Sequence, residues 1–297
     1  MDATSMGTAA SPQGYDGANV PGWSRHVVSA LVAVLSTRTY VLSLVTVRGQ
    51  GLAPSPQLTA AQAGPLYAAW VPGASATRII VFGRGLVADP AGFRLTRQSS
   101  ERVDALVSYV GQNAAAFAAR RGRVVFSGGW AGAAEGFGRP PPECREGSLM
   151  LDRAMAADIG GTSLADYADA FSEIESDSTL ENVLRIKEEG YFDGASFTAR
   201  NPLGLVAHRE HLPRISYLVR KAFGLSGDTV VTITAGQGRE NYTGGLPESV
   251  LLPITRVAFA GARGHSSLRG RHRMLVAWDH RLRSLPQIAD ADRANRD

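Results

Sequence analysis

The chain has 297 residues, of which 44% are hydrophobic and 20% are charged, and its formal net charge is +4. This composition is ordinary for a globular protein and excludes a chain that is too polar to bury a core. The length suits one large α/β domain with added segments, or two small domains.

Nearly all the positive charge is carried by arginine, because Lys187 and Lys221 are the only lysines. Arginine favours bidentate contacts with carboxylates and phosphates. A GC-rich genome would give the same bias. The composition is therefore compatible with an anionic partner but does not require one.

One apolar stretch, residues 26–47, is the only membrane candidate. Arg38 and its polar neighbours split it into two runs of about ten residues, too short to cross a bilayer. It also lacks the features of a signal peptide, so we expect a packed helix, with an interfacial helix as the alternative. The single cysteine, Cys144, cannot form an intramolecular disulfide, and we predict a cytoplasmic location.

The chain begins with a segment rich in Gly, Ala, Ser and Pro, and we predict that residues 1–22 are disordered. Residues 23–72 predict a helical extension, broken at "GLAPSPQ". Residues 73–264 form the predicted core, and residues 265–297 follow as a basic C-terminal tail.

The core is predicted to alternate strands with helices. Short apolar runs between turn residues predict buried strands at 78–83, 123–129, 170–174, 204–208 and 228–236. Apolar residues at helical spacing and helix-ending glycines predict helices at 100–120, 144–160, 179–189, 211–224 and 247–264. This order predicts an α/β fold: a Rossmann-like parallel sheet of about five strands with helices on both faces, plus helical additions at both ends.

Unusual residues follow the first two predicted strands. In an open parallel sheet, ligands bind beyond the carboxyl ends of the strands. A glycine there can simply make a tight turn, or it can let backbone N–H groups approach an anion. Neither turn matches a dinucleotide or Walker motif. The turns are Gly83-Arg84-Gly85 and Ser127-Gly128-Gly129.

The third strand leads into a corner crowded with acidic and amide groups. Ser178 and Glu181, three residues apart, match a capping box before the helix that begins near Thr179. A cap explains Glu181 without any ligand, but it does not explain Glu175 or Asn182. We therefore predict that Glu175 and Asn182 face a shared cleft.

The fourth strand ends in His208, followed by His211 and, one turn into the next helix, Arg214. The two histidines could form a metal pair, but no carboxylate stands at a matching spacing, so we predict no metal. The alternative is that His211 is an ordinary polar surface residue and that Arg214 forms a structural salt bridge.

Four segments in this order and spacing resemble the YdcF-like family of the SanA/ElyC type: "FSGG", "REGSLMLDRA", "IESDSTLENV" and "VAHREHLPRISYLVRKAFG". The resemblance covers residues 78–264 and implies a Rossmann-like core with helical additions. It places functional polar positions at Gly83, Gly85, Ser127, Gly128, Gly129, Glu146, Glu175, Ser178, Thr179, Glu181, Asn182, His211 and Arg214. Arg84 and the long insertion at 130–144 depart from the family pattern, and the membrane anchor of many relatives is not seen.

The leading hypothesis is an enzyme, a transferase or hydrolase that acts on a phosphate- or nucleotide-bearing small molecule, in specialised biosynthesis. The glycine turns and Arg214 would hold the anion, and His211 would be the general acid or base. Glu175 or Glu146 would orient His211 or a substrate hydroxyl. The resemblance indicates S-adenosylmethionine or another nucleotide-like ligand as the cofactor.

Two alternatives remain open at this point. The first is a module that binds S-adenosylmethionine or a nucleotide without turnover. The second is a transferase that uses a tRNA-bearing substrate, reached through the basic segment 262–274. That segment nearly lacks the aromatic residues that interleave with basic ones in many nucleic-acid-binding surfaces.

Overall fold

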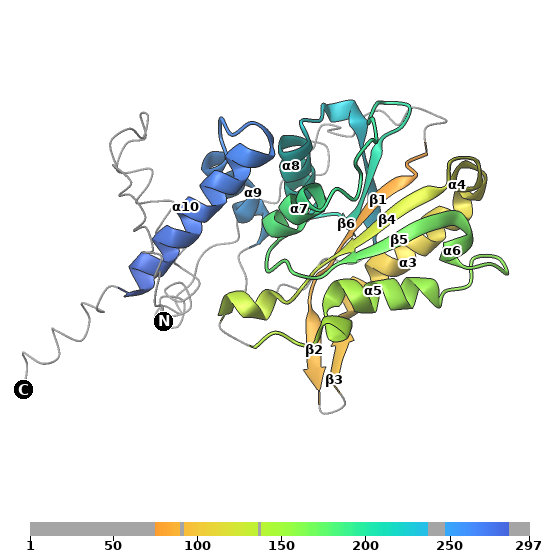
Figure 1. The fold of residues 1–297 in the computed structure, drawn as a ribbon, viewed down its shortest axis with the longest axis horizontal. Coiled ribbons are helices and arrows are strands. Elements are labelled where there is room, and N and C mark those ends of the chain that lie inside the picture. Colours follow the sequence, from red (N-terminus) through yellow and green to blue (C-terminus); the bar gives the residue numbers. More distant parts are fainter. Residues whose placement is uncertain (1–74, 90–91, 136–137, 237–246, 285–297) are drawn as a thin grey trace, which may run out of the picture.

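Figure 1 presents the computed structural model, which describes residues 75–89, 92–135, 138–236 and 247–284. The predicted disordered segment 1–22 and the predicted helical extension 23–72 lie outside the described residues. The apolar stretch 26–47 lies outside them as well. Within the described residues, no helix is long and apolar enough to cross a membrane.

A five-stranded parallel sheet forms the centre of the fold and confirms the predicted class. Its order is β5-β4-β1-β6-β7, so the strands stand in chain order 3-2-1-4-5, the Rossmann arrangement. The order reverses between β1 and β6, which makes their carboxyl ends the expected ligand position. The strands are β1 (Arg78–Phe82), β4 (Gly122–Ser127), β5 (Ala168–Glu173), β6 (Leu203–His208) and β7 (Val230–Ala235).

Helices cover both faces of this sheet (Figure 1). On one face lie α3 (Arg97–Gln112) and α5 (Glu146–Met155), and on the other lie α7 (Thr179–Glu188) and α8 (Leu212–Phe223). Side chains alternate along each strand, so one strand supplies two separate cores. In β1, Ile79 and Val81 pack under α3, whereas Ile80 and Phe82 pack under α7 and α8.

Three predicted helices differ from the observed ones, and the one predicted at 247–264 ends already at Ala258. The helix predicted at 100–120 begins earlier, at Arg97, and is divided at Asn113 into α3 and α4 (Ala114–Arg120). The helix predicted at 144–160 begins at Glu146 and ends at Met155, and beyond it Asp158 accepts a hydrogen bond from the N–H of Gly161 and closes a turn. Gly160 lies in that turn, with φ of 64°, and the short helix α6 (Leu164–Tyr167) follows.

A hairpin of β2 (Leu86–Asp89) and β3 (Gly92–Leu95) extends from the carboxyl edge of the sheet, and we did not predict it (Figure 1). Each of its strands has only four residues, too few for a clear alternation of apolar and polar side chains.

The C-terminal part adds two helices over α7 and α8. In α9 (Glu248–Ala258), Pro253 stands inside a helix that continues past it. We described residues 265–297 as a tail, but α10 (Gly264–Ser284) covers much of this segment. Leu268 is fully buried in the core under α7 and α8, which fixes α10 to the domain.

Candidate functional site

The parallel sheet brings most of the predicted site positions to its carboxyl edge. Each position follows a strand or begins the helix after it, as a Rossmann-like topology requires. The strand reversal between β1 and β6 lies at the centre of this group. Around it stand Gly83, Arg84, Gly85, Ser127, Gly128, Gly129, Glu146, Thr179, Asn182, His208, His211 and Arg214.

The turn after β1 binds an anion that the chain itself supplies. Oε1 of Glu146, the first residue of α5, accepts hydrogen bonds of 2.5 Å from the N–H groups of Arg84 and Gly85. It accepts a third from the Ser99 hydroxyl, also at 2.5 Å. A side chain at Gly83 would overlap the Glu146 carboxylate, so this position requires glycine.

The other glycine N–H groups bond to backbone carbonyls. Gly83 donates to Ser127, Gly128 to Glu173 and Gly129 to Ser176, at 2.8, 3.0 and 3.1 Å. A Cβ at Gly129 would overlap the Ser176 carbonyl oxygen. These glycines therefore permit close approach between strand ends.

A fully buried arginine, Arg102 of α3, fills the space between the ends of β1 and β6. Its Nη1 donates to the carbonyls of Phe82 and Gly83, both at 2.8 Å. Its Nε donates to Nδ1 of His208 at 3.1 Å, and its Nη2 lies 3.3 Å from Nδ1 of His211. Arg102 thus joins the two strands at which the sheet order reverses.

His208 is held in one tautomer by its two partners. Because Nδ1 accepts from Arg102, the proton is on Nε2, which lies 3.0 Å from Oε2 of Glu101. The hydrogen bond from His208 keeps the pKa of Glu101 below its ordinary value, and Arg97 adds to this effect.

His211 stands between two guanidinium groups. Arg102 lies at its Nδ1, and Nη2 of Arg214 lies 2.9 Å from its Nε2. Nε2 is also 3.3 Å from the Thr179 hydroxyl and 3.6 Å from a carboxylate oxygen of Glu248. Arg214 makes a bidentate pair with Glu248, with both contacts at 2.7 Å.

The imidazole of His211 is neutral at physiological pH. Burial lowers its pKa well below the ordinary value, and the charges of Arg214, Arg102 and Arg84 lower it further. A neutral imidazole can accept a proton, so the ring is a candidate general base. An arginine, not a carboxylate, lies at Nδ1, which separates this arrangement from a nucleophile–histidine–carboxylate triad.

The buried acid at the end of β5 is Glu173, which we did not predict. Its carboxylate accepts hydrogen bonds from the hydroxyls of Ser127 and Ser176 and from the N–H groups of Glu175 and Ser176. Burial raises the pKa of Glu173, although the two hydroxyl bonds act in the opposite direction. The side chain of Glu173 is only 1% exposed.

Glu175 lies farther out than we predicted. Its side chain is 43% exposed and pairs with Arg139 at 2.9 Å and with Arg145. Arg139 comes from the insertion at 130–144, which contains the short helices η2 (Ala131–Glu135) and η3 (Pro142–Cys144), and it also pairs with Asp177. Glu175 therefore fastens this insertion to the corner after β5.

The predicted helix cap is present at Ser178, with one change. The Ser178 hydroxyl accepts from the N–H of Glu181 at 3.3 Å, whereas the Glu181 carboxylate accepts from the N–H of Asp177 at 2.9 Å. Asn182 is buried and donates to the Ser127 carbonyl at 3.4 Å. Thr179 alone among these residues approaches His211.

Sequence reasoning missed Arg102, Ser99, Glu101 and Glu248 in addition to Glu173. Arg102 carried a usable signal, since it shares a helical face with the buried residues Leu106 and Val110. Glu173 carried no comparable signal, because its pairing with Ser127 on the neighbouring strand depends on the register of the sheet.

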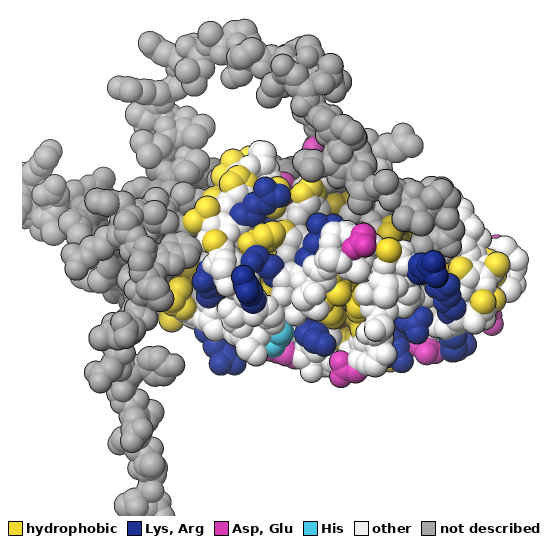
Figure 2. Space-filling view, turned by 90° about the horizontal axis from the view of Figure 1, so that it is seen from above, with side chains coloured by type: hydrophobic (Ala, Val, Ile, Leu, Met, Phe, Trp, Pro, Cys, Tyr) yellow, Lys and Arg dark blue, Asp and Glu magenta, His cyan; other side chains and the backbone are white. Residues whose placement is uncertain are grey.

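Two arginines of α10 have partners within the fold. Arg269 pairs with Glu188 and lies 3.8 Å from Glu181, and Arg271 donates to the carbonyls of Ala258 and Ala260. On the face seen in Figure 2, Lys and Arg side chains form separate groups with Asp and Glu between them. Across the described ranges, no group of three or more His, Cys, Asp or Glu is placed to hold a metal.

The chain was compared with family models, curated proteins and solved structures. None of the three comparisons found a match. The functional argument therefore depends on the geometry of the carboxyl edge.

Proposed function

We propose that the protein is an enzyme that acts on a phosphate- or nucleotide-bearing small molecule, as a transferase or hydrolase. The observation that carries this proposal is the position of His211, a buried imidazole between the guanidinium groups of Arg102 and Arg214. A neutral imidazole can take a proton at physiological pH, and guanidinium groups bind phosphate oxygens.

The position of this group in the fold supports the proposal. Ligands of Rossmann-like sheets bind where the strand order reverses, and Arg102 and His208 lie there between β1 and β6. The resemblance to the YdcF-like family, with its nucleotide-like ligands, points in the same direction.

In the proposed reaction, a phosphate group of the ligand replaces the Glu248 carboxylate as the partner of Arg214. In this exchange His211 loses its contact with Arg214, and in the tautomer that carries its proton on Nδ1 the Nε2 atom accepts the proton of an attacking hydroxyl. Arg102 is fully buried and fixed by two carbonyls, so its positive charge acts on the charge that develops on the ligand at a distance and not by direct contact. The attacking hydroxyl belongs to a second substrate in a transfer and to water in a hydrolysis.

The other acids have positioning roles in this proposal. Glu146 fixes the turn that carries Arg84, and Glu173 fixes the ends of β4 and β5 through Ser127 and Ser176. Glu175 holds the insertion and has no direct part in proton transfer.

The experiment is a calorimetric binding screen of nucleoside phosphates, small phosphate esters and S-adenosylmethionine. We expect Arg214→Gln to weaken binding of the phosphate-bearing ligand at least tenfold. We expect Glu248→Gln to strengthen binding, because the competing carboxylate is removed. Arg153→Gln and Asp104→Asn, which break an exposed ion pair of 2.8 Å elsewhere, are the matched controls.

Two results would overturn the proposal: no phosphate-bearing compound binds, or Arg214→Gln binds such a compound as tightly as the wild type does. A second candidate function, a binding module without turnover, is favoured by the burial of both histidines, each only 3% exposed. That function predicts tight binding of a nucleotide or S-adenosylmethionine, with the ligand recovered unchanged after long incubation.

A further inference from the structure

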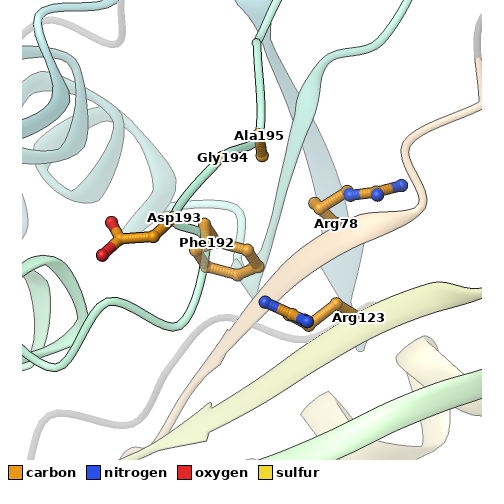
Figure 3. A pocket seen from close by; sticks show the side chains of 6 residues that line it. All are labelled: Arg78, Arg123, Phe192, Asp193, Gly194 and Ala195. Carbon is orange, nitrogen blue, oxygen red and sulfur yellow. The ribbon is translucent and has the colours of Figure 1, made fainter.

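A pocket of about 180 Å³ lies at the opposite, amino-terminal edge of the sheet (Figure 3). Arg78 opens β1, Arg123 stands second in β4, and the segment 192–195 after α7 closes the pocket. Phe192 supplies an aromatic wall and is itself 6% exposed. None of these residues takes part in the proposed reaction at the carboxyl edge.

The two arginines of this pocket are neighbours in the sheet. Arg78 and Arg123 are register partners on adjacent parallel strands, so their side chains leave the same face of the sheet. Adjacent strands are separated by about 4.8 Å. Like charges placed directly opposite one another destabilise a sheet unless something compensates them.

No carboxylate compensates this pair within the described part of the chain. Arg78 donates to the Thr77 hydroxyl at 3.1 Å, and Arg123 donates to the Tyr191 carbonyl at 2.7 Å, so both have only neutral hydrogen-bond partners. The nearby Asp193 carboxylate lies 3.8 Å from Lys187 and points away from both guanidinium groups in Figure 3.

We propose that this pocket binds a small oxyanion, a phosphate or carboxylate group, through Arg78 and Arg123. The anion neutralises the paired cations, and the ring of Phe192 packs against any apolar part of the ligand. Pockets for drug-sized ligands measure about 300–1,000 Å³, so a pocket of about 180 Å³ suits a small anion better than a whole nucleotide.

The test is thermal unfolding of the full chain in phosphate, in malonate and in chloride at matched ionic strength. We expect phosphate or malonate to raise the Tm by several degrees relative to chloride, because a ligand that binds only the folded state stabilises it. Arg78→Gln should lower this rise to the part that anion binding at Arg214 contributes. Arg120→Gln removes one positive charge from an exposed position on α4 and should preserve it.

Arg214→Gln removes any contribution of the carboxyl edge, and the part of the rise that depends on Arg78 should remain. Arg123→Lys keeps the charge but loses the planar fork, and should reduce the rise. The proposal is overturned if neither anion raises the Tm above the chloride value. It is equally overturned if Arg78→Gln shows the same rise as the wild type, or if the rise disappears completely in Arg214→Gln, since the anion would then bind elsewhere.

Discussion

The two edges of the sheet differ in how their charged side chains are paired. At the carboxyl edge, Arg102, Glu146 and Glu173 are almost fully buried and have several hydrogen-bond partners each. At the amino edge, Arg78 and Arg123 stand side by side with only neutral partners among the described residues. Arg123 also lies over the Phe171 ring, at 5.6 Å from its centroid. A satisfied network indicates a preorganised site, whereas a pair of like charges with no opposite charge beside it indicates a place for an ion from outside.

The largest loss of stability is expected for a substitution at the carboxyl edge. Arg102→Met should lower the free energy of unfolding by several kcal/mol, because it leaves buried carbonyl and imidazole acceptors unsatisfied, each at a cost of about 1–3 kcal/mol. Denaturant unfolding measures this loss. Arg120→Met, at an exposed position, is the control and should change stability by less than about 0.5 kcal/mol. Equal stability of the two variants would contradict the proposed importance of the network.

The next largest loss of stability is expected at the end of β5, where two acids can be compared. Glu173→Ala leaves two buried hydroxyls and two N–H groups without their acceptor, and each unsatisfied buried donor costs about 1–3 kcal/mol. Glu175→Ala removes exposed ion pairs, which contribute about 0–1 kcal/mol. Chemical denaturation of both variants tests the order, and a larger loss in Glu175→Ala would reverse our assignment.

A smaller effect should appear in the pH dependence of stability. The pKa of His211 is lowered in the folded state, so the unfolded chain takes up a proton near pH 6.5 that the folded chain does not. The free energy of unfolding should therefore fall as the pH drops below about 6.5. The pKa of His272 is also lowered by burial, so His272 likewise makes the free energy of unfolding fall at low pH. The raised pKa of Glu173 has the opposite effect on stability and partly offsets the two histidines.

Unfolding curves of the wild type and His211→Asn between pH 7.5 and 5.5 measure this contribution. We expect the variant to show a weaker dependence on pH, with the remainder assigned to His272. Identical slopes in the two proteins would show that His211 does not carry the predicted linkage.

The smallest effect is expected at the amino edge. In chloride, Arg78→Gln should leave stability within about 0.5 kcal/mol of the wild type or raise it slightly, since it removes one of two like charges. A clear loss of stability in this variant would mean that Arg78 has a structural partner, and the contrast between the two edges would fail.

The five strands of the sheet could be predicted from the sequence, because strands such as 78–83 and 204–208 are continuous apolar runs between turn residues. The sequence also predicted which residues lie at the carboxyl edge, since the carboxyl ends of parallel strands lie at the same edge of a sheet. It did not reveal Arg102 or Glu173, whose partners come from elements far away along the chain. It also missed α10, where a few apolar residues such as Leu268 bury a helix that is otherwise strongly polar.

The central claim is that His211 is a general base for a phosphate-bearing substrate. The most direct measurement is conversion of a panel of phosphate-bearing compounds by the wild type and by His211→Asn, followed by phosphorus NMR and mass spectrometry. Our account predicts that the wild type converts at least one compound and that His211→Asn binds the same compound but converts it at least a hundredfold more slowly. Equal conversion by the two proteins, or binding by the wild type with no conversion of any compound, would contradict it.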